Sequence, residues 1–119
     1  FFKDLPSEAL MQLINQGEVV ELPENALVIE QGGVSDSLWV IIQGKCRASI
    51  DGKKIREMNA KDVFGEIGII WNSPRTSRVA TLQPSILLKI QAHYVWDLLS
   101  QNLNIAVSLQ MLGEIRLRA

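Results

Sequence analysis

The chain has 119 residues, of which 47% are hydrophobic and 21% charged, with a formal net charge of −1. This length argues for one domain with one core. The near balance of charge provides no long-range field that gathers polyanions, so it disfavours broad nucleic-acid binding. The longest apolar runs, such as Leu38–Ile42 and Ile67–Trp71, have five residues, whereas a transmembrane helix needs about 20.

The chain begins with a short amphipathic helix, predicted over about 6–16. In "LPSEALMQLINQG", Ser7 is a suitable cap, Glu8 lies in the first turn, and Gly17 ends the helix. The start "FFKDLP" has neither an initiator Met nor a signal-peptide pattern, so we expect a piece of a longer protein.

The next segment, about 18–90, consists of short apolar or alternating runs separated by turn residues. Asp51-Gly52, between two strand-like runs, is a strong hairpin signal. Many short, regularly spaced strands predict an antiparallel β-roll, barrel or sandwich. Cys46, the only cysteine, lies in such a run and is expected to be a small buried residue rather than a reactive thiol.

The helical period returns over about 91–119 and predicts two C-terminal helices, of which the last spans roughly 102–118. The predicted fold class is therefore α+β, mainly β, in one domain over 1–119. Trp39, Trp71 and Trp96 lie in apolar runs and are expected in the core, although Trp71 is also a candidate for a partly exposed contact.

One stretch, "FGEIGIIWNSPRTS" at 64–77, combines an acid and an arginine with glycines and an apolar run. Arg75 suits a phosphate, which a guanidinium can bind through two hydrogen bonds. Glu66, when ionised, only accepts hydrogen bonds and so suits a hydroxyl donor. Gly65 precedes a predicted helical turn at Glu66–Ile70, where backbone N–H groups favour an anion. A small ligand with a phosphate, a sugar hydroxyl and a flat base would use all of these features.

This stretch resembles the phosphate-binding cassette of cyclic nucleotide-binding domains in catabolite-activator-type regulators, cyclic-nucleotide-dependent kinases and cyclic-nucleotide-gated channels. "IEQGGVSDSLWVIIQGKCRASI", "RVATLQPSILLKI" and the closing "IRLRA" are similar to further parts of that family, so the resemblance covers essentially the whole chain. It implies a β-roll of the jelly-roll type that binds cAMP or cGMP, without a metal or another cofactor and without catalysis.

The resemblance also implies a role for each cassette residue. Glu66 would bind the ribose 2′-hydroxyl and Arg75 the cyclic phosphate. The remaining ligand-binding candidates are backbone groups and small residues around them: Gly65, Ile67, Gly68, Thr76 and Ser77. The Thr76 hydroxyl could also reach the 2-amino group of a syn guanine, although cAMP is the first expectation because it is frequent in the family.

The resemblance further implies a cytoplasmic signalling module that moves its last helix and so acts on an attached effector domain outside this segment. A homodimer through that helix is a further expectation, and no nucleic-acid or membrane contact is expected. Two residues depart from the family pattern: Lys61 stands where glycine is usual, and Gly68 where alanine is usual.

Other interpretations remain open at this stage. The cassette could be degenerate, leaving a ligand-free dimerisation domain of the same fold. A metal-dependent oxygenase on a similar β-roll would need several clustered histidines. The chain has one, His93, which we expect to be a surface or packing residue.

Overall fold

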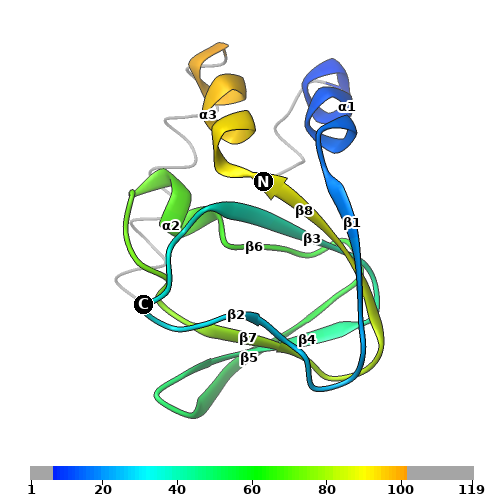
Figure 1. Ribbon diagram of the computed structural model, residues 1–119, viewed down its shortest axis with the longest axis vertical. Helices are drawn as coiled ribbons and strands as arrows, with labels where there is room; N and C mark the ends of the chain where they lie inside the picture. The colour runs from blue at the N-terminus through cyan, green and yellow to red at the C-terminus, as the bar shows by residue number, and fades with distance from the viewer. Residues whose placement is uncertain (1–6, 102–119) are drawn as a thin grey trace.

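Two four-stranded antiparallel sheets face each other in this computed structural model, which describes residues 7–101 (Figure 1). Sheet 1 has the order β1-β8-β3-β6, with β1 at Glu18–Leu22, β8 at Ser85–Gln91, β3 at Ser37–Gln43 and β6 at Val63–Phe64. Sheet 2 has the order β2-β7-β4-β5, with β2 at Leu27–Ile29, β7 at Arg78–Thr81, β4 at Lys45–Ile50 and β5 at Lys53–Asn59. The predicted antiparallel β-roll is confirmed.

Among residues 7–101, three helices pack against this roll (Figure 1). Helices α1, Ser7–Asn15, and α3, Ala92–Gln101, lie side by side over the outer face of sheet 1. The short helix α2, Glu66–Ile70, follows β6 directly, as the sequence predicts for the cassette. The last predicted helix, and with it the expected dimer contact, lies outside the described residues.

The core has two parts because sheet 1 is buried on both faces. Between the sheets, Trp39 and Ile41 of β3 pack with residues of sheet 2. On the other face, Leu38 of β3 packs under α1 and α3. A strand buried on both faces needs apolar residues at successive positions, which explains the continuous run of β3.

Tight turns set the register of sheet 2. Asp51 and Gly52 have φ values of 51° and 81°, as a two-residue turn of type I′ requires, and they join β4 to β5 in the predicted hairpin. Ser49 pairs with Lys54, but the next residue, Ala48, pairs with Arg56, so one extra residue bulges from β5.

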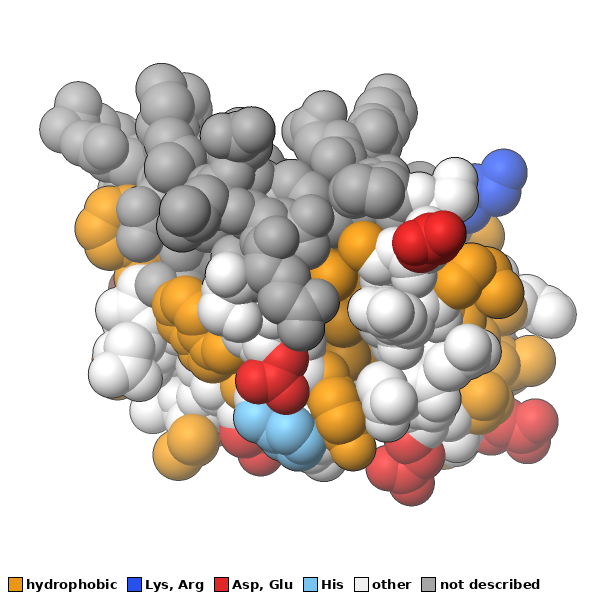
Figure 2. Space-filling view, turned by 90° about the horizontal axis from the view of Figure 1, so that it is seen from above, with side chains coloured by type: hydrophobic (Ala, Val, Ile, Leu, Met, Phe, Trp, Pro, Cys, Tyr) orange, Lys and Arg blue, Asp and Glu red, His pale blue; other side chains and the backbone are white. Residues whose placement is uncertain are grey.

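The helix-covered face is partly apolar at its surface. Seen from above, hydrophobic side chains lie between polar ones over α1 and α3 (Figure 2). Trp96 of α3 is 42% exposed, so the expectation of a core position for it was wrong. Trp71, the residue after α2, is 41% exposed, which agrees with the alternative of a partly exposed position rather than with a core position. No helix among residues 7–101 combines the length and the apolar character that crossing a membrane requires.

Candidate functional site

The site begins at Gly65, where the chain turns from β6 into α2. Gly65 has a φ of 91°, which favours glycine. A Cβ at this position would lie 2.7 Å from Nη1 of Arg75 and 3.0 Å from the carbonyl oxygen of Ser37. Glycine is therefore required both by the backbone conformation and by the close approach of Arg75.

Arg75 is held in place by two backbone carbonyls. Its Nη1 donates to the Gly65 carbonyl at 2.8 Å and its Nη2 to the Ser37 carbonyl at 2.6 Å. The residue is only 6% exposed. Burial lowers the pKa of its guanidinium, and the nearby Asp36 carboxylate opposes this shift. Since the ordinary pKa of arginine is so high, the side chain keeps its charge.

The loop between β2 and β3 is bound to the segment that carries Arg75. The Arg75 backbone N–H donates to the Gly33 carbonyl at 2.9 Å, and the Gly32 N–H donates to the Arg75 carbonyl at 2.8 Å. The Ser35 hydroxyl donates to the Ser73 carbonyl at 2.6 Å. A Cβ on Gly68 would collide with the Ser35 hydroxyl, so the glycine in α2 makes room for this contact.

One pocket gathers nearly all of the residues that the sequence predicts for the site. It encloses about 410 Å³ of empty space, which includes open solvent. Six of the seven candidates line it: Gly65, Glu66, Gly68, Arg75, Thr76 and Ser77. The seventh, Ile67, lies in α2, but its side chain is not described. Glu66 is 5% exposed, so the pocket joins a buried carboxylate to a buried guanidinium.

The floor of this pocket comes from sheet 2, which the sequence pattern of the cassette does not predict. Ile29, Val79 and Ala48 lie at paired positions of β2, β7 and β4. Arg56 of β5 pairs with Ala48 and ends the row. An apolar strip with a cation at one end suits the face and the edge of a flat polar ring. The sequence did not predict that Arg56 lines the pocket, because the bulge in β5 changes which residues of this strand face sheet 1.

The described residues offer no candidate for a metal centre. Among residues 7–101, no three His, Cys, Asp or Glu side chains gather in a way that could hold a metal ion. His93 is exposed, as expected. The pocket thus combines two arginines, Arg75 and Arg56, with one carboxylate, Glu66, and several small residues.

Comparison with known proteins gives the family. The model of the cyclic nucleotide-binding domain matches residues 19–102. The cGMP-dependent protein kinase egl-4 of Caenorhabditis elegans is 28% identical over 113 residues, which are 95% of this chain and 14% of the kinase. The cAMP-dependent protein kinase regulatory subunit of Mucor circinelloides f. lusitanicus is 29% identical over 86 residues, 72% of this chain and 20% of that protein. This chain therefore spans only a small part of these relatives.

Solved structures show the same fold. The catabolite activator protein of Thermus thermophilus superposes with a TM-score of 0.82 at 20% identity, over 98% of this chain and 57% of that one. The regulatory domain of Toxoplasma gondii PKA, crystallised with cAMP, gives a TM-score of 0.76 at 21% identity, over 82% of this chain and 39% of that one. The family model covers most of the chain and the fold agrees with it, so this chain belongs to the cyclic nucleotide-binding domain family, as a domain of the regulatory type.

Proposed function

We propose that this domain binds a cyclic nucleotide in the pocket, with Arg75 on the cyclic phosphate and Glu66 on the ribose 2′-hydroxyl. The observation that carries the proposal is the buried guanidinium beside a buried carboxylate in one pocket. Arginine has five N–H groups, and backbone carbonyls occupy two of those of Arg75. The others are available to an anion, which would also offset the burial of the charge.

The ligand is cAMP or cGMP, and its role is regulatory rather than catalytic. The relatives include a cGMP-dependent protein kinase and the regulatory subunit of a cAMP-dependent protein kinase. We propose that binding in the cytoplasm changes the position of the segment 102–118 and so acts on an attached effector. A ligand shifts such an equilibrium only by the difference between its affinities for the two states. A homodimer through this segment remains part of the proposal.

Arg75 gives the decisive test. We expect Arg75→Ala to weaken binding of cAMP and cGMP by about 2–4 kcal/mol, or roughly 30- to 1000-fold, through loss of a charge-assisted contact. The mutation also leaves the Gly65 and Ser37 carbonyls without their donor, so Arg75→Lys serves as a second variant that keeps the charge. Isothermal titration calorimetry on all three proteins measures the affinities.

The matched control is Arg78→Ala. Arg78 is exposed on β7 and does not line the pocket, so its removal should leave both affinities unchanged. Equal affinity of wild type and Arg75→Ala would rule out the phosphate assignment. If the wild type binds neither nucleotide, the alternative of a degenerate, ligand-free dimerisation domain takes its place.

Glu66→Gln tests the sugar contact separately. The amide keeps the shape of the side chain but loses the charge that strengthens a hydrogen bond from a hydroxyl. The variant should bind cAMP and cGMP more weakly and should discriminate less against their 2′-deoxy analogues. Discrimination equal to that of the wild type would show that Glu66 does not contact the ribose.

A further inference from the structure

No helix of the described residues covers the outer face of sheet 2. The inner face of this sheet packs against sheet 1, whose far side is covered by α1 and α3 (Figure 1). Successive side chains of a strand point to opposite faces of a sheet. On β4, Cys46 and Ala48 are buried between the sheets, so Lys45 and Arg47 belong to the outer face. This face is therefore open to a partner.

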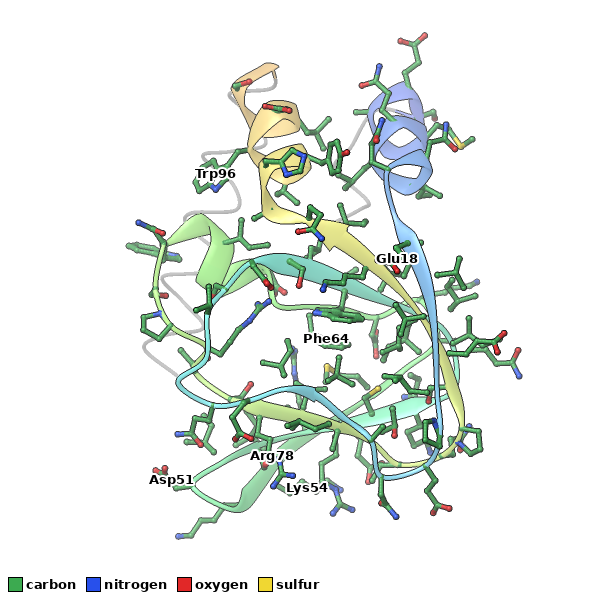
Figure 3. All side chains as sticks on the ribbon, viewed as in Figure 1. Glu18, Asp51, Lys54, Phe64, Arg78 and Trp96 are labelled. Atoms are coloured by element: carbon green, nitrogen blue, oxygen red, sulfur yellow. The ribbon has the colours of Figure 1, made fainter. Side chains whose placement is uncertain are left out.

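Positive charge gathers on the outer face of sheet 2, on four cations that are exposed or half-buried: Lys45, Arg47, Lys54 and Arg78. Lys54 of β5 and Arg78 of β7 both pair with Ser49 of β4, so they flank this residue in one row. Their side chains project away from sheet 1 (Figure 3). The net charge of −1 for the whole chain does not reveal this face, because it sums over all sides of the molecule.

Glu57 is the one carboxylate on the strands of sheet 2. It pairs with Arg47 across the sheet, and its Oε1 accepts a hydrogen bond from Nζ of Lys54 at 2.9 Å. The hydrogen bond and the charge of Lys54 lower the pKa of Glu57, and the charges of Lys45 and Arg47 contribute less. The hairpin turn at 51–53 adds one charge of each sign. Four cations less one carboxylate leave this face with a net charge of +3.

Two aliphatic side chains lie at the edges of the same face. Ile55 is the residue that bulges from β5, at one edge of sheet 2, and it is 51% exposed. Leu27 of β2, at the other edge, is 48% exposed. It pairs with Ala80, which in turn pairs with Arg47, so Leu27 shares the face of that cation. The cations thus lie between two exposed aliphatic side chains.

The size and the composition of this face favour a lipid surface over a protein partner. Four strands of up to seven residues span roughly 14 by 23 Å, or about 320 Å². A stable protein interface needs about 800 Å² from each partner. Binding to a bilayer instead increases with each cation, by roughly fivefold per Lys or Arg near anionic lipid. Exposed aliphatic side chains beside the cations suit the boundary between headgroups and acyl chains.

We propose that the outer face of sheet 2 docks this domain onto an anionic membrane surface. The four cations lie against the lipid headgroups, and Ile55 and Leu27 reach the boundary with the acyl chains. A net charge of +3 corresponds to roughly 100-fold enrichment at the membrane, which is weak and reversible docking. None of the four cations lines the nucleotide pocket, so docking and ligand binding use separate residues.

Sedimentation of the 119-residue chain with lipid vesicles tests the proposal. Vesicles with about 30% phosphatidylserine in phosphatidylcholine should bind the domain at low salt, and vesicles of phosphatidylcholine alone should not. Arg47→Gln and Arg78→Gln should each lower the partition coefficient roughly fivefold. Glu57→Gln should raise it by a similar factor, because it removes the one opposing charge. Ile55→Ala should lower it roughly fivefold through loss of apolar contact.

The matched control is Lys61→Gln, which removes an exposed lysine in the turn before β6 of sheet 1 and should leave the partition coefficient unchanged. Circular dichroism checks that each variant is folded. Equal binding to both kinds of vesicle, or equal losses for Lys61→Gln and Arg78→Gln, would overturn the proposal. Binding to polyglutamate without binding to anionic vesicles would also overturn it and assign the face to an acidic polypeptide. Calorimetry with cAMP and cGMP reports on the proposed function separately, because Arg78 does not line the pocket.

Discussion

Lys61, which replaces the glycine usual in the family, has a strained backbone conformation but does not line the pocket. Its φ is 78°, in the turn that leads into β6, and its backbone N–H donates to the Ile41 carbonyl at 2.7 Å. This left-handed region destabilises the folded state of a residue with a Cβ by about 1–2 kcal/mol. Glycine removes that strain, but it also gives the unfolded chain more conformational freedom, which offsets part of the gain. Lys61→Gly should therefore raise the free energy of unfolding by about 0.5–1 kcal/mol.

Urea denaturation measures this gain, and Lys61→Ala is its control because alanine retains the Cβ. The alanine variant should be no more stable than the wild type. A similar gain for both variants would mean that the lysine side chain, rather than the backbone conformation, is responsible. Affinity for cyclic nucleotides should stay the same in both, since Lys61 does not line the pocket.

Gly68 is a case in which propensity and packing give opposite predictions. Helix propensity alone says that alanine in α2 is better by roughly 0.5–1 kcal/mol. In the structure a Cβ at Gly68 would clash with the Ser35 hydroxyl, lie 2.6 Å from its Cβ, and lie 3.1 Å from the Ser73 carbonyl. We expect Gly68→Ala to destabilise the domain by about 1–3 kcal/mol, as overpacking does.

A double-mutant cycle identifies the cause. With Ser35→Gly as the background, only the Ser73 carbonyl still lies close to the added Cβ, and Gly68→Ala should cost much less than it does in the wild type. If Gly68→Ala costs the same in both backgrounds, the clash is not the reason. The sequence could not have shown this, because it identifies Gly68 as a weak helix residue but does not bring Ser35, on another loop, next to it.

Strand β5 explains why the cassette could be predicted from the sequence, whereas the side of the pocket lined by Arg56 could not. If the hairpin continued from the Asp51-Gly52 turn without a bulge, Ala48 would pair with Ile55, and an apolar side chain would face the interior. The bulge instead leaves Ile55 51% exposed and pairs Arg56 with Ala48. A one-residue shift moves every later side chain to the other face. The cassette needed no such information, since its residues are adjacent in the chain.

Cys46, on the inner face of β4, should make the stability of the domain depend on pH. Cys46 is fully buried between Met58 and Thr81 on the neighbouring strands, and burial raises the pKa of its thiol to about 11. In the unfolded chain the thiol ionises first, at its ordinary pKa of 9.0. Above pH 9 the unfolded state thus binds fewer protons, and the stability should fall as the pH rises from 9 to 11, by at most about 3 kcal/mol.

Urea denaturation of wild type and Cys46→Ala across this pH range tests the effect. The variant lacks the thiol, so its stability should fall less steeply than that of the wild type, whatever other groups titrate. Parallel curves would show that the thiol does not ionise differently in the two states. At pH 7 the native thiol should also react with iodoacetamide only as fast as the protein unfolds, because the thiolate is the reactive form.

At the scale of the whole molecule, the fold depends on a two-part core of which only one side, at Phe64, Ile29, Ala48 and Val79, lines the ligand pocket. Phe64 lies between the sheets, and its ring is nearly parallel to that of Trp39, with the two ring centroids 6.3 Å apart (Figure 3). Helices α1 and α3 cover the other face of sheet 1. The sequence predicted this arrangement because its apolar runs and turns agree with it throughout. It did not predict the exposed position of Trp96, which projects from α3 (Figure 3), because an apolar run does not show which side of a helix remains uncovered.

A domain with such a core should fold without ligand and gain stability from it by mass action. At a free concentration of 100 times Kd, a ligand that binds only the folded state adds about 2.7 kcal/mol. For a domain of this length that gain raises Tm by roughly 10 °C. Differential scanning calorimetry with cGMP should show this rise for the wild type and a much smaller one at the same concentration for Arg75→Ala. EDTA should not change the rise, since the proposed contacts are a guanidinium, a carboxylate and backbone groups. A rise that EDTA abolishes would require a metal ion in the complex, and an equal rise in the Arg75 variant would place the ligand elsewhere on the domain.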